Sequence, residues 1–358
     1  MHTRPRVSTL LALLLAVTAP AAAQSGDERA GQYDFADSHF HLTNYVQEGT
    51  DVRDFLRIMG TRAGRSTLFG IPLQQTWSYA NSGNYAPTYY LQSDAPLYYY
   101  SFTDAFIAMA YRALPPEQRA RFDPMITGFD PADMYAAAHI RRVLRTFPGV
   151  FTGIGEFTIH KEFVAPKVAG GAASLLDPAL DSILAFAGES GLLVILHNDV
   201  DIPFAKAGAP PAYLDQLRAV LGRHPHTTVI WAHTGVGRIV RPVSQHLSMI
   251  ESIIRDQALS HVYFDLSWDE VAKYIVASDS SIALASAFLN RFPDRFLFGT
   301  DVVSPKTAEQ YFAVFDIYKP FLDRLTPDAR SRLLRGNYQR LFDAARQRVR
   351  AWESAHRD

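Results

Sequence analysis

The chain has 358 residues and no cysteine, and its 35 lysine and arginine residues nearly balance 36 aspartate and glutamate residues, for a net charge of −1. The lack of cysteine excludes disulfides, thiolate metal ligands and a lipid anchor on an N-terminal cysteine. The near balance of charge argues against a nucleic-acid partner and against an anionic membrane surface.

The first residues have the features of a secretory signal peptide. Arg4 and Arg6 form a short basic region, residues 10–17 are apolar, and three alanines at 21–23 provide a cleavage site. We therefore expect residues 1–23 to be removed and the mature protein to be periplasmic or secreted, with no membrane anchor after cleavage. The alternative is a retained anchor, but the apolar run is short for a bilayer span.

Residues 24–358 are expected to form a single domain in which eight β-like runs alternate with helical patterns. The runs are Tyr33–His41, Ser66–Pro72, Leu97–Phe102, Val150–His160, Leu192–His197, Thr227–His233, Val262–Trp268 and Phe296–Asp301. Several are almost continuously apolar, which is typical of parallel strands buried on both faces. Eight such units predict an α/β fold, a (β/α)8 TIM barrel.

The helical patterns complete this prediction, and one early segment departs from it. Helices are expected at Asp133–Phe147, Pro178–Ser190, Tyr213–His224, Val243–Asp256 and Ser281–Phe292, followed by paired C-terminal helices within Pro327–His356. The segment 77–100 is rich in tyrosine, glycine and asparagine, which predicts a long aromatic-rich early loop or cap. Its aromatic residues, with Trp268, are candidates for the wall of a pocket.

Polar residues that can bind metal recur where the predicted strands end. His39 and His41 lie two residues apart on one strand, so their side chains share a face while Phe40 points the other way. The other candidates, each at the end of a different run, are Glu156, His197, His233 and Asp301. Burying one such group costs several kcal/mol unless it is paired or coordinated. Because barrel active sites form at these strand ends, the pattern predicts a metal centre.

Four further residues are candidates for substrate contact, each with an alternative structural role. His160 and Lys161 follow Glu156 into the same loop. Arg238 follows His233 by five residues and could bind an anionic group through two hydrogen bonds, although a surface role is equally compatible with its position. Trp268 ends the seventh run and could equally pack in the core.

These motifs resemble the metal-dependent amidohydrolase superfamily, and within it the amidohydrolase-related family. The resemblance rests on His39-Phe40-His41, His197, His233 and Asp301 in that order, and on the ending Gly336-Asn337-Tyr338-Gln339-Arg340-Leu341-Phe342. It implies a divalent metal, commonly zinc, that activates water for attack on a carbonyl. It also implies that Asp301 accepts the proton of that water and that His233 takes part in catalysis or metal binding.

Glu156 separates two versions of this site. In some hydrolase branches a fourth-strand carboxylate bridges two ions, and the Gly153-Ile154-Gly155-Glu156 context resembles that bridging glutamate. One ion would then be held by His39, His41 and Asp301, and the second by His197 and His233. In the decarboxylase branch one ion suffices, and Glu156 would pair with Lys161 or an arginine.

The leading hypothesis is an exported hydrolase of a C–O or C–N bond in a small-molecule ester, lactone or amide. Two alternatives stay open: a single-metal non-oxidative decarboxylase of a small carboxylic acid, and a barrel that binds a ligand without turnover. The sequence is also compatible with a homo-oligomer. It does not name the substrate.

Overall fold

A computed structural model describes residues 33–44, 48–72, 76–77, 91–92, 99, 101–161, 173–206 and 208–356. The expected signal peptide and most of the aromatic-rich segment lie outside these residues. Within the described part, no helix combines the length and the apolar character that a bilayer span requires.

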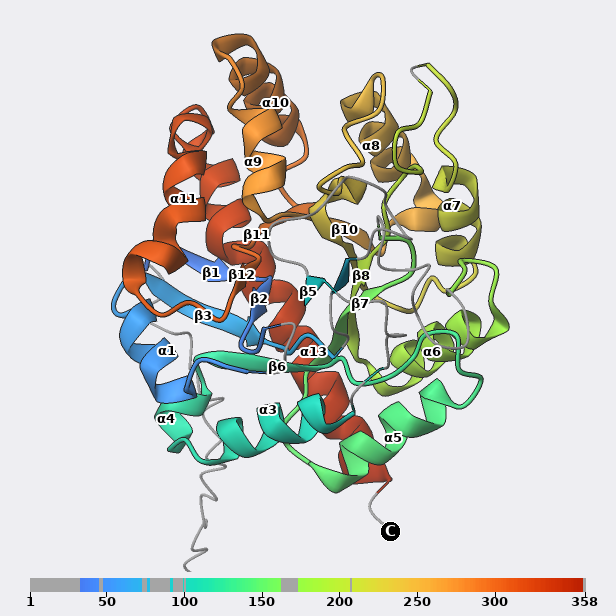
Figure 1. The fold of residues 1–358 in the computed structure, drawn as a ribbon, viewed down its shortest axis with the longest axis vertical. Coiled ribbons are helices and arrows are strands. Elements are labelled where there is room, and N and C mark those ends of the chain that lie inside the picture. The colour runs from blue at the N-terminus through green and yellow to red at the C-terminus, as the bar shows by residue number, and fades with distance from the viewer. Residues whose placement is uncertain are drawn as a thin grey trace, which may run out of the picture.

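Eight parallel strands form a nearly closed barrel surrounded by helices, which confirms the predicted TIM barrel (Figure 1). In spatial order the strands are β1 (Phe35–Asp37), β3 (Ala63–Leu68), β6 (Phe122–Ile126), β7 (Gly153–Thr158), β8 (Leu193–His197), β9 (Val229–Trp231), β10 (Val262–Leu266) and β11 (Phe296–Phe298). The last strand meets the first where the Ser38 amide donates a 3.0 Å hydrogen bond to the Phe298 carbonyl.

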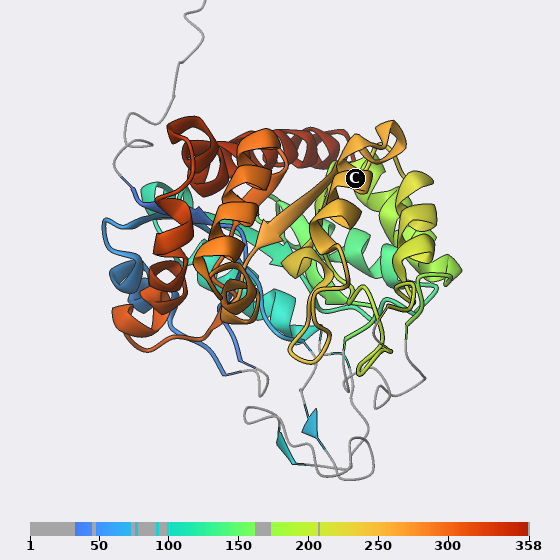
Figure 2. The ribbon, with the colours of Figure 1, turned by 90° about the horizontal axis from the view of Figure 1, so that it is seen from above.

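Two short parallel pairs accompany the barrel. β2 (Phe40–His41) pairs with β12 (Val302–Val303). This pairing brings the segments that follow the first and last barrel strands together beside the barrel mouth. β4 (Thr76–Trp77) pairs with β5 (Leu91–Gln92) within the predicted aromatic-rich segment. The second pair lies beyond the end of the barrel opposite the C-terminal helix (Figure 2).

The helices cover the outside of the barrel and follow the predicted order. Their bounds are α1 (Val52–Met59), α3 (Phe102–Arg112), α4 (Pro116–Arg119), α5 (Ala136–Thr146), α6 (Pro178–Ser190), α7 (Leu214–Gly222), α8 (His246–Arg255), α9 (Asp269–Ile275), α10 (Asp279–Arg291), α11 (Ala308–Leu322), α12 (Pro327–Ser331) and α13 (Asn337–Ala355). The predicted helix 178–190 has the observed bounds, because Pro178 occupies a favoured first position and Gly191 adopts the left-handed conformation that ends a helix.

Side-chain alternation along the strands creates two apolar layers. In β8, Leu193 and Ile195 point into the barrel, whereas Val194 and Leu196 pack against the outer helices. His197 continues the inward-facing series at the end of the strand. The same two-residue period brings candidate metal-binding side chains to the barrel mouth.

The C-terminal helix closes the opposite end of the barrel, where Figure 2 shows it lying across the strands. Leu341 and Phe342 join the inner apolar layer. Asn337 anchors the start of α13 by donating to the carbonyls of Pro293 and Phe296, at 2.7 and 2.8 Å. The Gly-Asn-x-x-Arg-Leu-Phe ending is therefore a structural plug, not part of the mouth.

The third strand differs from the prediction. Phe102, the end of the expected strand 97–102, begins helix α3, and the third strand is β6 at Phe122–Ile126. Its sequence contains Asp123 and Pro124, which usually argue against a central strand. Asp123 is tolerated because it faces the closed end of the barrel, where Arg65 and Arg346 pair with it.

Candidate metal centre

The six predicted metal-binding residues converge at the mouth of the barrel, where the strands end. Their side chains come from five separate elements of the chain: His39 and His41, Glu156, His197, His233, and Asp301. All are buried except Asp301, whose side chain keeps 12% of its surface exposed. The predicted convergence of these positions is therefore what the fold produces.

One group of candidate ligands lies where the first and last barrel strands meet. His41 Nε2 lies 3.1 Å from Asp301 Oδ1, and His39 Nε2 lies 3.4 Å from the same oxygen. The backbone holds this arrangement, because the Asp301 amide donates to the His39 carbonyl at 2.7 Å. The three side chains offer one ligand atom each, mutually within 4.8 Å.

A second group lies beside the first. Glu156 Oε1 is 2.5 Å from His197 Nδ1 and 3.4 Å from His233 Nε2. The same carboxylate reaches the first group, with Oε1 3.8 Å from His39 Nε2 and Oε2 3.6 Å from His41 Nε2. Glu156 therefore stands between the two groups.

Backbone strain at the mouth aims two of these side chains. His233 and Asp301 have φ angles of 55° and 52°, in the left-handed region that residues other than glycine seldom adopt. Such conformations persist only where the surrounding structure enforces them, and they cluster at functional sites. At His233, the backbone amide donates to the Asp265 carboxylate at 2.8 Å, which holds the turn in place.

The donor set fits a divalent cation. The Nε2 atoms of His39 and His233 are buried and have no hydrogen-bond partner among the described residues, although both face neighbouring carboxylates. A buried nitrogen left in this state costs about 1–3 kcal/mol. Imidazole and carboxylate are ligands that zinc and similar divalent metals accept. Bound divalent ions would give each of these nitrogens a partner.

The carboxylates at the mouth are ionised. Burial alone would raise the pKa of Glu156, but Lys161 and His197 hold it well below its usual range. Burial likewise opposes ionisation of Asp301, yet His39 and His41 lower its pKa to about 2. The same pairing acts on the histidines: despite burial, Asp265 and Asp301 raise the pKa of His39 well above its usual range, and Glu156 helps to raise the pKa of His197 to about 9. A cation at the mouth would therefore take the place of these protons between ionised carboxylates and imidazoles.

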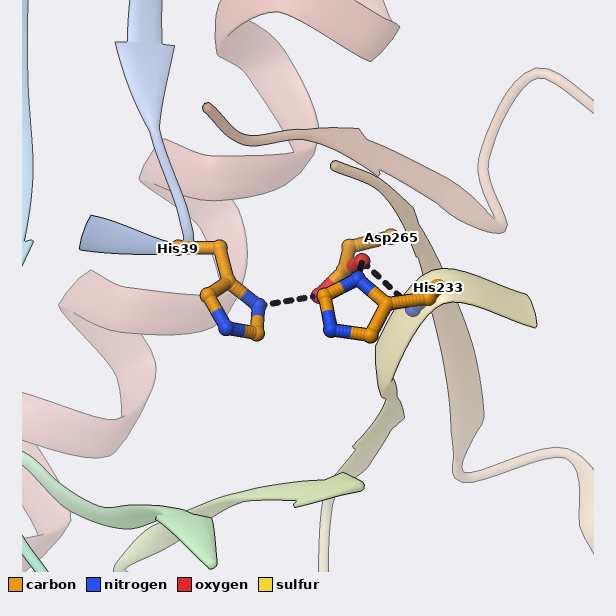
Figure 3. Close-up of side chains that lie close together, drawn as sticks. All are labelled: His39, His233 and Asp265. Atoms are coloured by element: carbon orange, nitrogen blue, oxygen red, sulfur yellow. Dashed lines mark hydrogen bonds and ion pairs between the residues drawn. The ribbon is translucent and has the colours of Figure 1, made fainter. Parts of the chain in front are cut away.

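Two residues that the sequence reasoning did not single out support this cluster. Asp265, in β10, accepts a 3.0 Å hydrogen bond from His39 Nδ1 (Figure 3). Ser267 Oγ lies 2.7 Å from His233 Nδ1. Inward alternation from Tyr263 through Asp265 to Ser267 was the signal that could have found them, because an aspartate inside an apolar strand needs a partner.

The predicted substrate-contact residues occupy different positions. Lys161 is buried and lines a cavity together with His41 and Glu156. His160 packs instead against Tyr213, with parallel rings 3.7 Å apart. The Trp268 ring lies 5.1 Å from that of His233.

Arg238 is committed to neighbouring side chains. Its guanidinium lies over the Trp268 ring at 5.2 Å and donates a 2.6 Å hydrogen bond to Glu270. Arg238 thus contacts Trp268, and the Trp268 ring in turn neighbours His233.

The barrel and the convergent histidines and carboxylates at its mouth define a metal-dependent, hydrolase-like class of enzyme. The sequence pattern of the amidohydrolase family matches residues 36–344. The chain therefore belongs to the amidohydrolase family, as the motifs had indicated.

Comparison with solved structures agrees on the fold. A candidate 2-pyrone-4,6-dicarboxylic acid hydrolase from Pseudomonas putida aligns with a TM-score of 0.53 and 14% identity, covering 87% of this chain and 98% of its own. Dihydroorotase from Campylobacter jejuni aligns with a TM-score of 0.50 and 10% identity, covering 87% and 83%. No curated protein sequence matches the chain.

Proposed function

We propose that this protein is an exported hydrolase that cleaves a C–O or C–N bond in a small-molecule ester, lactone or amide, with two divalent ions held at the barrel mouth. His39, His41 and Asp301 would hold one ion, and His197 and His233 the other. Glu156 would bridge them.

The position of Glu156 is the observation that carries this proposal. Its two oxygens lie within 3.8 Å of nitrogens from His39, His41, His197 and His233. A carboxylate can bind one ion through each oxygen, whereas a single ion would need fewer of these ligands. The competing interpretation, a pairing partner for Lys161 or an arginine, does not account for four histidines around one carboxylate.

The residues of the mouth would divide the chemistry between them. When bound, divalent ions supply Lewis acidity that polarises a carbonyl and makes water a better nucleophile. Asp301 would accept a proton from the attacking water at its carboxylate and pass it to the leaving group. Its partly exposed side chain, which borders the ligand cluster, supports this role. Trp268 would exclude water beside His233.

Metal content measured with and without the bridging side chain tests the proposal. Because each of the two ligand groups would hold one ion, we expect about two ions per chain in protein purified without chelators. Glu156→Gln should lose an ion and most of the turnover found in a screen of lactones, esters and amides. One ion in the wild type, with unchanged metal and turnover in Glu156→Gln, would contradict the bridge and favour decarboxylation.

Export is the part of the proposal that rests on residues 1–23. The basic start, the apolar run and the alanine cleavage site support it. N-terminal sequencing of the protein secreted or released from the periplasm of a bacterial host should begin near Gln24. Recovery of the uncleaved chain with the membrane fraction would favour the retained anchor.

A further inference from the structure

We propose that Asp265 is a positioning residue that orients one histidine of each ligand group and so couples the two metal positions. This inference rests on the proposed function insofar as that function requires both positions. It goes beyond it by assigning a role to a side chain that would not itself touch an ion.

Asp265 divides its two oxygens between the two groups. Oδ2 accepts from His39 Nδ1 at 3.0 Å, while Oδ1 accepts from the His233 backbone amide at 2.8 Å (Figure 3). Its carboxylate is completely buried. Removing its charge or turning its plane would therefore disturb both histidines at once.

Ser267 extends this contact to the second imidazole ring. Its hydroxyl donates to Asp265 Oδ1 at 2.5 Å, so the serine oxygen is left to accept from His233 Nδ1 at 2.7 Å. The result is a directed chain from His233 through Ser267 to Asp265. Each ring thus carries its proton on Nδ1.

The consequence is that Nε2 of each ring is the free ligand atom. Both Nε2 atoms are buried, lack a hydrogen-bond partner within the part of the chain that the structure describes, and face the carboxylates of the mouth. His39 belongs to the group with His41 and Asp301, and His233 to the group with Glu156 and His197. The two histidines also lie in a third group with Asp265, but both oxygens of that carboxylate are already engaged in the hydrogen bonds described above. Removing a carboxylate that orients a metal-binding histidine in this way commonly weakens metal affinity 10–100-fold.

The roles of the two supporting residues predict different binding patterns. Zinc binding to metal-free protein would be measured by competition with a chromophoric chelator. Asp265→Asn should weaken both ions, each about 10–100-fold. Ser267→Ala should weaken one ion by a similar factor and leave the other within about twofold. His233 Nδ1 loses its 2.7 Å partner, whereas His39 Nδ1 keeps its 3.0 Å bond to Asp265 and loses only a 3.5 Å contact with Ser267.

A matched control separates positioning from stability. Asp123 is an equally buried aspartate at the closed end of the barrel. Its hydrogen-bond partners in the described part of the chain are arginine, tyrosine and threonine side chains. Asp123→Asn should lower the unfolding midpoint while both zinc constants stay at wild-type values. Wild-type zinc constants in Asp265→Asn, or equal weakening of both ions in Ser267→Ala, would overturn the proposal.

A second measurement does not depend on metal occupancy. In metal-free protein with 15N-labelled histidine, the Nδ1–H groups of His39 and His233 should give exchange-protected signals, assigned with His39→Gln and His233→Gln. Ser267→Ala should lose only the His233 signal. If neither is protected in the wild type, Asp265 does not orient these rings. If both are protected but zinc does not bind, the positioning role stands and the proposed function fails.

Discussion

Tyr338 donates a 2.8 Å hydrogen bond to Asp123, although 215 residues separate the two in the sequence. The contact ties the C-terminal helix to the third strand at the closed end of the barrel. Asp123 is completely buried, and its pKa falls to about 2 because Arg65 and Arg346 outweigh the effect of burial. Contacts at this end of the molecule stabilise the barrel, whereas the opposite end contains the candidate metal centre.

Removing the charge of Asp123 should therefore destabilise the fold strongly. Asp123→Asn leaves Arg65 and Arg346 without their buried counterion, at a cost of about 3–5 kcal/mol in the free energy of unfolding. Tyr338→Phe removes one hydrogen bond to a charged group and should cost about 1.5–3 kcal/mol. Urea unfolding measures both, and a smaller loss in Asp123→Asn than in Tyr338→Phe would contradict this ordering.

Gly299 permits the close approach of the last barrel strand to His39, the first of the candidate metal ligands. A methyl group at this position would lie 2.6 Å from His39 Cβ and 3.0 Å from Ser267 Cβ. We expect Gly299→Ala to reduce zinc affinity at least tenfold, because a displaced ligand loses its alignment. The same chelator competition would measure it.

Gly222 provides the control for that substitution. It is the last residue of α7, and a methyl group added there meets nothing within 4 Å. Gly222→Ala should leave zinc binding unchanged and stabilise the helix by up to about 1 kcal/mol. Equal zinc affinity in the two alanine variants would show that the space beside His39 is not limiting.

The buried carboxylate of Asp104 should make stability depend on pH. Burial raises its pKa to about 7, although it accepts hydrogen bonds from the amides of Thr127 and Gly128. Between about pH 4 and pH 7 the folded chain keeps a proton that the unfolded chain releases, so the free energy of unfolding falls as pH rises. The full effect is at most about 4 kcal/mol.

Asp104→Asn tests this dependence, because an amide oxygen can still accept from Thr127 or Gly128 but cannot ionise. The loss of stability between pH 4 and pH 8 should be smaller in the variant than in the wild type. Denaturant unfolding at a series of pH values measures the difference. Parallel pH profiles would mean that Asp104 does not hold its proton in the folded state.

Zinc should stabilise the metal-free protein by an amount that grows with the logarithm of the free zinc concentration above its dissociation constant. An ion that binds only the folded chain adds about 2.7 kcal/mol at a free concentration one hundred times its dissociation constant. We expect the unfolding temperature to rise with added zinc in the wild type. In a His39→Ala, His233→Ala double variant, which removes a ligand from each group, most of the rise should disappear.

The sequence predicted the barrel well wherever burial left a continuous apolar run. Strand β8 and helix α6 were recognised because their residues are apolar on nearly every buried position and proline and glycine mark the helix ends. Strand β6 was missed, since Asp123 and Pro124 look unfavourable until the distant arginines of β3 and α13 are present. Local patterns do not contain that compensation.

The candidate site shows the same division. His39, His41, Glu156, His197, His233 and Asp301 were predicted to converge, and the strand ends do place them together. Asp265 was not predicted because it lies inside its strand and not at the strand end. Its role depends on which histidine ring atoms face its carboxylate, and only the structure shows this. Likewise, the packing of His160 on Tyr213 follows from the path of a loop and not from its spacing to Glu156.

The pairing of β2 with β12 has a consequence for the order of events in the life of the chain. His41 and Asp301 are 260 residues apart, and their ligand group exists only after the last barrel strand has docked on the first. A nascent chain, or one threaded unfolded through a translocation channel, has no such site to carry an ion with it. The compartment in which the barrel closes would therefore supply the metal, and the available pool there would decide which ion the enzyme receives.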